Sequence, residues 1–244
     1  MKNNNIKNHY EILDLARGFA ILLMFIYHFS YDLDYFGFID QNFAHDEFWK
    51  NFRSLIVTLF LTIMGMSLYL ASYRGLRKKR FRQRLLLLLF YAALVSISSW
   101  IMYPKAMIFF GILHFIAVAS VLGLAFVRLG VINLLLGLCL IIMAQTLHHS
   151  LFDHAYLQWF GLTTKLPVTV DYVPLLPWFG VVLIGIYLGQ LLSQRPAGSF
   201  FPRWKNTHPA TQLLALGGRH SLHIYMLHQP LFLGILYIIN QIIP

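Results

Sequence analysis

The sequence predicts an all-α integral membrane protein, a polytopic bundle of about seven transmembrane helices. Hydrophobic residues make up 58% of the 244 positions and charged residues only 11%, whereas about a quarter of the residues in a soluble domain are charged. The mean hydropathy is +0.64. A net charge of +10 also occurs in nucleic-acid-binding proteins, but this composition leaves no water-soluble body to carry a basic patch. We therefore expect membrane lipids around the chain and no nucleic-acid partner.

Seven apolar stretches divide the chain, and a membrane span needs about 20 such residues. The first stretch has no small-residue cleavage site, so we expect a retained span rather than a removed signal peptide. No soluble segment separates the stretches, and residues 1–244 are expected to form a single domain. The expected spans are Ile12–Tyr31, Phe52–Tyr73, Leu85–Tyr103, Met107–Val127, Val131–Leu147, Val173–Leu192 and His220–Ile243.

The positions of Lys and Arg predict the orientation. With a cytoplasmic N-terminus, 15 of the 19 basic residues lie inside, so the cytoplasmic side carries +13 and the outer side −3. Because basic residues beside a span resist translocation, we expect the N-terminus in the cytoplasm and the C-terminus outside, in the inner (cytoplasmic) membrane. Seven basic residues lie within segment 74–84. Topology and anionic lipids explain them, and attraction of a phosphate-bearing cofactor is the alternative.

Charged and titratable residues inside the first expected span indicate a functional site, because a charge in hydrocarbon costs about 2.5–3.5 kcal/mol on insertion scales. Arg17 and His28 are eleven positions apart, so they share one helix face and lie roughly 16 Å apart along the axis. His28 and Asp32 have the i, i+4 spacing of a His–carboxylate pair, in which the carboxylate orients the imidazole. An interfacial pair that only meets headgroup water fits the same spacing.

The last expected span carries a second group of polar residues. The segment from Gly217 to Ser221 is expected to open a helix on the cytoplasmic side, where free backbone amides and Arg219 suit an anion. His228 shares one helix face with Ser221, and Pro230 is expected to kink the helix. The single cysteine excludes an internal disulfide and a cysteine-rich metal site. We expect no metal.

Four motifs together resemble one family: Leu13-Asp14-x-x-Arg17-Gly18 leading to His28, Gly111-Ile112-Leu113-His114, Pro177-Trp178-Phe179-Gly180, and Gly218-Arg219-His220-Ser221-Leu222-x-x-Tyr225-x-x-His228-Gln229-Pro230. They are similar to bacterial relatives of heparan-alpha-glucosaminide N-acetyltransferase over almost the entire chain, and the last motif is the most specific. The resemblance implies a transmembrane acyltransferase that takes an acetyl group from cytosolic acetyl-CoA and delivers it to a sugar, such as a glucosamine, or a glycoconjugate on the far side. It also implies a homodimer.

The resemblance and the residue pattern together assign roles to eleven residues. The expected catalytic residues are His28, Asp32 and His45. The expected cofactor-binding residues are Arg17, Arg219, His220, Ser221 and His228. The expected acceptor-binding residues are His114, Asp171 and Trp178.

Two mechanisms are compatible with these roles: His28, oriented by Asp32, acts as general base, or it carries the acetyl group covalently. The animal enzyme keeps no histidine at the position matching His28 and relies on one in the following luminal segment, which here contains His45. The large luminal portion of the animal enzyme is also missing. A cell-wall sugar, glycolipid headgroup or free amino sugar is therefore expected as acceptor instead of heparan sulfate.

Two other classes of membrane protein fit the residues. Histidines such as His28, His114 and His228 on facing helices suit bis-imidazole ligation in a b-type haem protein. Intramembrane His and Asp residues with a Pro-broken helix also occur in proton-coupled transporters, although the sequence contains no inverted repeat that supports this class.

Overall fold

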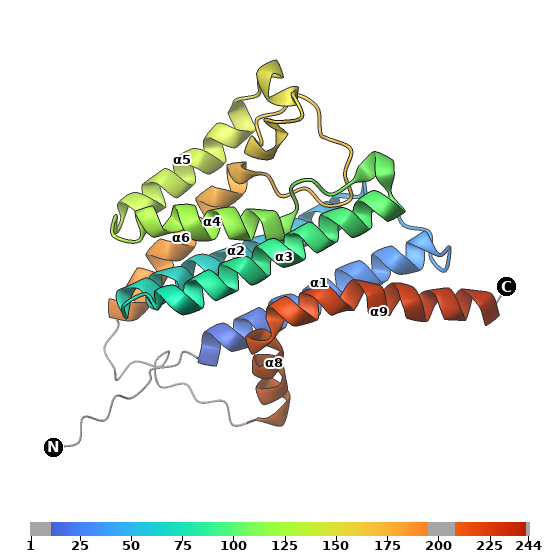
Figure 1. Ribbon diagram of the computed structural model, residues 1–244, viewed down its shortest axis with the longest axis horizontal. Helices are drawn as coiled ribbons and strands as arrows, with labels where there is room; N and C mark the ends of the chain where they lie inside the picture. The colour runs from blue at the N-terminus through green and yellow to red at the C-terminus, as the bar shows by residue number, and fades with distance from the viewer. Residues whose placement is uncertain (1–10, 195–207, 243–244) are drawn as a thin grey trace. The chain divides into compact units, whose positions relative to one another are not determined.

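The computed structural model consists of helices and their connections. The structure describes residues 11–194 and 208–242, which contain eight α-helices, three 3-10 helices and no strand (Figure 1). The all-α prediction is confirmed for this part of the chain. The α-helices are α1 (Glu11–Tyr35), α2 (Glu47–Tyr73), α3 (Lys78–Met102), α4 (Ile112–Phe126), α5 (Ile132–Thr146), α6 (Leu175–Gln194), α8 (Pro209–Arg219) and α9 (Ser221–Ile242). The 3-10 helices are η1 (Pro104–Ala106), η2 (Ser150–Asp153) and η3 (Gln158–Phe160).

Each of the seven expected spans overlaps one of these helices. Among the described residues, α1, α2, α3, α6 and α9 are long and apolar enough to cross a membrane. Helices α4 and α5 have 15 residues each, or about 22 Å, against a hydrocarbon core of about 30 Å. The chain is therefore a multi-pass membrane protein with five long apolar helices in its described part. The count of seven spans and the orientation stay predictions.

Helix α8 corrects the interpretation of the glycine pair before the last span. The side chain of His208 accepts a hydrogen bond from the backbone amide of Ala210 and caps the start of α8. Gly217 and Gly218 belong to the last turn of α8, and α9 begins only at Ser221. The pair therefore ends one helix and does not open the next. Sequence reasoning missed α8 because its 11 residues are too few to resemble a span.

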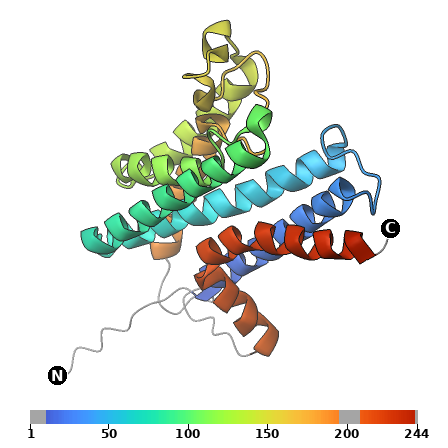
Figure 2. The same cartoon turned by 45° about the vertical axis from the view of Figure 1, so that its right-hand side comes forward.

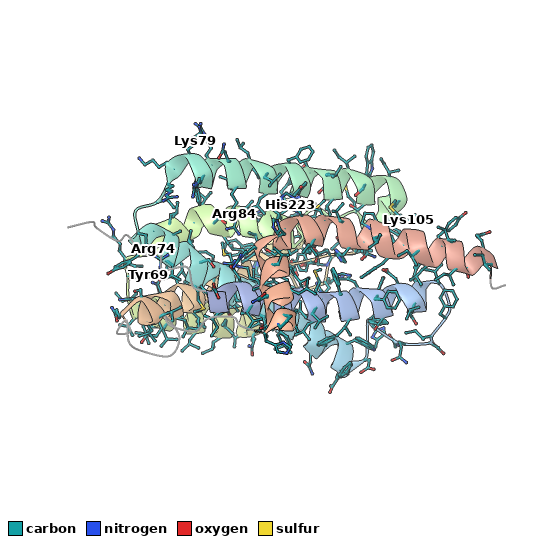
Figure 3. The ribbon with its side chains drawn as sticks, turned by 90° about the horizontal axis from the view of Figure 1, so that it is seen from below. Tyr69, Arg74, Lys79, Arg84, Lys105 and His223 are labelled. Atoms are coloured by element: carbon teal, nitrogen blue, oxygen red, sulfur yellow. The ribbon has the colours of Figure 1, made fainter. Side chains whose placement is uncertain are left out.

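The basic segment 74–84 lies where α2 is joined to α3. Figure 3 shows Arg74 and Lys79 at this end of α3 and Lys105 at the other end. The seven basic residues of segment 74–84 therefore lie together at one end of α3, and the orientation stays a prediction. Five other basic residues used in that prediction lie outside the described residues: Lys2, Lys7, Arg195, Arg203 and Lys205.

The chain divides into two compact units. The first comprises residues 1–60 and 195–244, and the second residues 61–194, so the division falls within α2. In the first unit α1 and α9 run side by side, and α8 packs against α1 (Figures 1 and 2). Ile21, Met24 and Ile56 form the buried core of this unit. That residues 1–244 act as a single domain stays a prediction.

The second unit is built around α6, which packs closely on two neighbours through glycines. Gly185 lies against the backbone of Thr62 in α2, and Gly189, one turn later, also faces the backbone of α2. Gly180 of α6 and Gly137 of α5 each approach the other's carbonyl oxygen. Small residues let membrane helices approach in this way. The Gly185-x-x-x-Gly189 spacing therefore marks a contact within the chain, and a homodimer stays a prediction.

Helix α8 packs on α1 through two further glycines. Gly18 of α1 lies against the backbone of Leu214, and Gly218 of α8 lies against the carbonyl oxygen of Asp14. A Cβ atom at either position would collide with a backbone atom. The neighbouring Gly217 is different, because a Cβ atom there would meet only the Cδ1 atom of Ile224, at 3.9 Å.

Replacing Gly218 by alanine is expected to destabilise the first unit, whereas the same change at Gly217 is expected to be harmless. A methyl group at Gly218 must push α8 away from α1, and such overpacking costs about 1–3 kcal/mol. Alanine at Gly217 adds only helix propensity, worth up to about 1 kcal/mol. Thermal unfolding of the purified variants, followed by tryptophan fluorescence, measures both effects. Equal melting temperatures for Gly218→Ala and Gly217→Ala would contradict the close contact.

Candidate functional site

An ion cluster lies at the start of α1 and is called the arginine cluster here. Asp14 is only 4% exposed and accepts two charged hydrogen bonds. Nη1 of Arg17 donates to its Oδ1 at 2.8 Å, and Nε of Arg219 donates to its Oδ2 at 3.1 Å. The i, i+3 spacing places Asp14 and Arg17 on one face of α1, and the last turn of α8 supplies Arg219. Asp14 therefore draws two guanidinium groups together, and guanidinium groups bind phosphates and carboxylates through pairs of hydrogen bonds.

An apolar groove with a volume of about 400 Å³ leads along α1 from the arginine cluster. It begins at Gly18, next to Arg17, and extends to Phe25, two turns farther along the same helix. Four residues of α8 form part of its wall, together with the exposed His220 and Ile224 of α9. The groove therefore connects the arginine cluster with the middle of α1.

The junction between α8 and α9 differs from the anion site expected there. The backbone amide of His220 is not free, because it donates to the carbonyl oxygens of Leu216 and Gly217 at 3.2 and 3.1 Å. Ser221 is half-buried as the first residue of α9. These bonds form because α8 ends at Arg219 and α9 begins only at Ser221. The amide of His220 is therefore not a donor for an anion, and the first turn of α9 begins one residue later than expected.

Two histidines meet beyond the far end of the groove. The rings of His28 in α1 and His228 in α9 lie edge to face, with centroids 4.9 Å apart. The rings are in contact, which leaves no room for a haem plane between them. Phe25 stacks on His228 at 5.8 Å and so joins the histidine pair to the groove. His28 is half-buried, and His228 is 5% exposed.

The tautomer of His228 follows from its hydrogen bond. Its Nδ1 atom lies within hydrogen-bonding distance of the backbone carbonyl oxygen of Tyr225. A carbonyl oxygen only accepts, so Nδ1 carries the proton, and Nε2 of the neutral ring presents a lone pair. The Nε2 atom is buried and has no partner among the described residues. His228 therefore offers a hydrogen-bond acceptor next to His28.

Asp32 pairs with Gln229 instead of His28. The carboxylate is 1% exposed, and its Oδ1 accepts a hydrogen bond from Nε2 of Gln229 at 2.7 Å. No hydrogen bond joins His28 to Asp32 within the described residues, so the direct pair expected from the i, i+4 spacing is not formed. Sequence reasoning gave Gln229 no role because its partner lies 197 positions away. Its place directly after His228 in the last motif was the available signal.

His45 lies in the connection between α1 and α2. Its side chain is exposed, and its backbone amide donates to Oδ1 of Asn42 at 3.1 Å. Aromatic residues link this connection to the histidine pair, because Tyr27 contacts both His28, at 5.4 Å between centroids, and Phe43, at 5.8 Å. Phe43 of this connection therefore packs on the residue next to His28, and both histidines stay candidates.

His114 and Asp171, which were expected to bind the acceptor, hydrogen-bond to the start of α4 in the second unit. Oδ2 of Asp171 accepts from the first amide of α4 at 2.9 Å. Because Gly111 has no Cβ atom, the carboxylate can approach this closely. Nδ1 of His114 accepts from the amide of Gly111 at 3.3 Å. Trp178, the third expected residue, is half-buried near the start of α6.

Ser96 and His114 resemble a nucleophile and its base, but their hydrogen bonds have the wrong direction. The Oγ atom of Ser96 lies 3.1 Å from Nε2 of His114. Since Nδ1 of His114 accepts from a backbone amide, Nε2 carries the proton and donates to Ser96. The Ser96 hydroxyl in turn donates to the carbonyl oxygen of Ile108 at 2.7 Å. An activated serine would need the reverse arrangement, so this network supports the connection between α3 and α4.

The long connection between α5 and α6 lies outside the apolar helices and is held by side-chain hydrogen bonds. The Thr164 hydroxyl and amide both donate to Asp153, and the hydroxyl bond lowers the pKa of this carboxyl. The ionised form is therefore favoured at neutral pH, and its contribution to stability is lost as the pH falls through the lowered pKa. Burial raises the pKa of Tyr172, whose hydroxyl donates to the carbonyl oxygen of Gln158 at 2.6 Å. These bonds hold the segment that carries Asp171.

The candidate residues Arg17, Arg219, His28, His228 and Asp32 all belong to the first unit. Gly18, at one end of the groove, directly follows Arg17, and Phe25, at the other end, stacks on His228. Across residues 11–194 and 208–242, no three His, Cys, Asp or Glu side chains gather as metal ligands.

Comparison with protein families identifies the family of the chain. A family model described as heparan-alpha-glucosaminide N-acetyltransferase, catalytic, matches residues 9–230. The matched range contains the arginine cluster, the groove and the histidine pair. Comparisons with the curated proteins and with the solved structures found no match.

Proposed function

Because the chain belongs to the family of heparan-alpha-glucosaminide N-acetyltransferase catalytic domains, we propose that it transfers an acetyl group from cytosolic acetyl-CoA to an amino or hydroxyl group of an extracytoplasmic sugar or glycoconjugate. The family and the five long apolar helices make the chain a multi-pass membrane acetyltransferase. The proposal adds the donor, the acceptor, the residues that act on them and a location in the inner (cytoplasmic) membrane.

The groove along α1 is the observation that carries this proposal. It runs along α1 from Gly18, next to Arg17, to Phe25, which stacks on His228, and these residues belong to one compact unit. Acetyl-CoA has a matching layout, with phosphates at one end, a thin pantetheine arm and a thioester at the other end. Arg17 and His28 are roughly 16 Å apart along the helix, a distance that the extended arm spans. The apolar wall suits the arm, and the arginine cluster suits the phosphates.

The phosphates of acetyl-CoA are assigned to Arg17 and Arg219, with His220 and Ser221 beside them. Only Nε of Arg219 bonds to Asp14 in the described part of the chain, and its side chain is 48% exposed. The guanidinium therefore has donors left for a phosphate, and planar guanidinium groups bind phosphates in pairs of hydrogen bonds.

His28 is assigned as the general base of the transfer. It takes the proton from the attacking amine or hydroxyl while the nitrogen or oxygen forms a bond to the thioester carbon. The C–S bond then breaks, and the proton passes to the leaving sulfur, which yields the acetylated acceptor and free CoA. Asp32 and His228 lie beside His28. An acetyl group carried covalently on His28 is the alternative, and ping-pong kinetics would identify it.

The acceptor is a cell-wall sugar, a glycolipid headgroup or a free amino sugar in this proposal. The roles of His114, Asp171 and Trp178 in binding it stay predictions, because the hydrogen bonds of His114 and Asp171 already explain them as supports of α4. His45 stays the alternative catalytic histidine.

Incubation of the purified chain with radiolabelled acetyl-CoA and a panel of amino sugars tests the proposed function. We expect label to appear in at least one sugar of the panel. If the wild-type chain neither transfers label nor binds acetyl-CoA, the proposed activity is wrong.

Arg219→Ala is expected to weaken acetyl-CoA binding by about tenfold, the effect of losing one hydrogen bond between charged groups. The KM of the sugar acceptor should stay unchanged, because the arginine cluster and the histidine pair lie at opposite ends of the groove. Arg128→Ala, which removes a cation from the second unit, is the matched control and should bind acetyl-CoA normally. Equal affinity in Arg219→Ala and the control would leave Arg219 as a topology signal only.

A further inference from the structure

The residues beside the histidine pair contain more hydrogen-bonding capacity than the transfer step uses. Asp32 of α1 and His228 and Gln229 of α9, called the Asp32 cluster here, come from two helices that run side by side (Figure 1). Asp32 and His228 are among the most buried polar residues of the described chain, at 1% and 5% exposed. Gln229 joins them, because its Nε2 donates to Oδ1 of Asp32.

Each member of the Asp32 cluster has one buried polar atom without a partner in the described residues. The three atoms are Oδ2 of Asp32, Nε2 of His228 and Oε1 of Gln229. All three accept hydrogen bonds and donate none: the first belongs to a carboxylate, the second has the lone pair of the neutral ring, and the third is an amide oxygen. Buried polar atoms in proteins are almost always paired, so three neighbouring exceptions of one kind point to a ligand.

Because these three atoms accept hydrogen bonds, their ligand must carry hydrogen-bond donors. The thioester itself only accepts hydrogen bonds, and the amide N–H groups of the pantetheine arm are set back from it, so the reacting group of acetyl-CoA has no donor for these three atoms. Sugar hydroxyls and amines carry the O–H and N–H donors that these three atoms need. We propose that the Asp32 cluster is the subsite for the N–H or O–H groups of the acyl acceptor, next to His28. This inference rests on the proposed function, and it moves His228 from the donor to the acceptor.

Gln229 has a positioning role in this subsite. Its Nε2 holds one carboxylate oxygen of Asp32, which directs the other oxygen away from the amide and toward a ligand. A carboxylate without this bond would be free to turn toward other donors. Loss of the Gln229 amide should therefore impair acceptor binding as strongly as a change of Asp32 itself.

Exchange of the two functional groups tests the subsite in the full chain, reconstituted in lipid nanodiscs. The single variants are Asp32→Asn and Gln229→Glu, which change hydrogen-bonding groups but hardly change volume. The double variant carries both changes and restores an amide facing a carboxylate. Gln190→Glu is the matched control, because Oε1 of Gln190 in the second unit is also buried without a partner in the described residues. Melting temperatures are measured with glucosamine, glucose or acetyl-CoA added, and KM values are measured for glucosamine and acetyl-CoA.

We expect each single variant to raise the glucosamine KM by about tenfold or more, the effect of one hydrogen bond to a charged group. The acetyl-CoA KM should stay within about twofold, and the double variant should regain most of the acceptor affinity. A purely structural role would not produce this rescue. If glucosamine alone shifts the melting temperature, the cluster binds the amine; if glucose shifts it equally, the cluster binds hydroxyl groups.

Two results overturn the subsite: unchanged acceptor KM in both single variants, or loss of acetyl-CoA affinity in place of acceptor affinity. The Gln190→Glu control should behave as the wild type in both measurements. A failure of the proposed function looks different. In that case the wild-type chain transfers no acetyl group, yet the sugars still shift its melting temperature, and the single and double variants still lose and regain that shift.

Discussion

His28→Ala is expected to lower the kcat of acetyl transfer by about 10²–10⁴-fold, the contribution of a positioned imidazole acting as general base. The ring lies beyond the end of the apolar groove and in contact with His228, so no water molecule in that place would have the same basicity and orientation. Acetyl-CoA binding should be almost unchanged, because the arginine cluster is intact. Initial rates with labelled acetyl-CoA and equilibrium binding of unlabelled acetyl-CoA measure the two quantities separately.

Two histidine variants complete this experiment. His223→Ala removes an exposed histidine from the same helix as His228 and should leave kcat unchanged. His45→Ala tests the alternative base. A large loss in His45→Ala with normal turnover in His28→Ala would move the base to the α1–α2 connection, and normal turnover in both would exclude general base catalysis by either residue.

Asp14→Ala is expected to produce the largest loss of stability, about 3–5 kcal/mol, the cost of removing one partner of a buried ion pair. Arg17 accounts for most of this loss, because its side chain is only 21% exposed beside the buried carboxylate. Arg219 contributes little, since it is 48% exposed and solvent screens its charge. Helix α8 should also loosen, because Arg219 ties its last turn to α1. Denaturation of the purified chain in detergent, followed by tryptophan fluorescence, measures the change.

Two variants show whether the uncompensated charge is the cause. Asp40→Ala removes an exposed carboxylate from the α1–α2 connection and should change stability very little. The double variant Asp14→Ala with Arg17→Leu removes both buried charges and should recover part of the loss. If the double variant is less stable than Asp14→Ala, Arg17 stabilises the first unit by packing and not through the ion pair.

Most helices could be predicted because hydrophobic composition acts locally. A run such as Phe52 to Tyr73 is apolar in any context, and the backbone in a membrane must satisfy its own hydrogen bonds, so a helix follows. The limits of α4 and the existence of α8 could not be predicted in this way. Helix α4 begins at Ile112, five residues after the apolar run starts, because the side chains of Asp171 and His114 bond to the amides there.

The candidate site was predictable only where its residues share one helix. Arg17 and His28 lie on one face of α1 because of their spacing, and this was evident from the sequence. The partner of Asp32 was not: the i, i+4 spacing favoured His28, yet Gln229 holds the carboxylate. The partner of Asp14 on α8 was equally hidden, because Arg219 is 205 positions away.

The sequence by itself determined that this chain is a helical membrane protein, which faces of its first and last spans are polar, and which family its motifs resemble. These properties depend on composition and on spacing within a helix, and both are local. Only the tertiary structure decided that Asp14 bonds to Arg219, that His28 touches His228 and that Asp32 bonds to Gln229. Such pairs depend on how two helices are rotated and shifted against each other, and close packing at glycines such as Gly18 and Gly218 sets this geometry in the first unit.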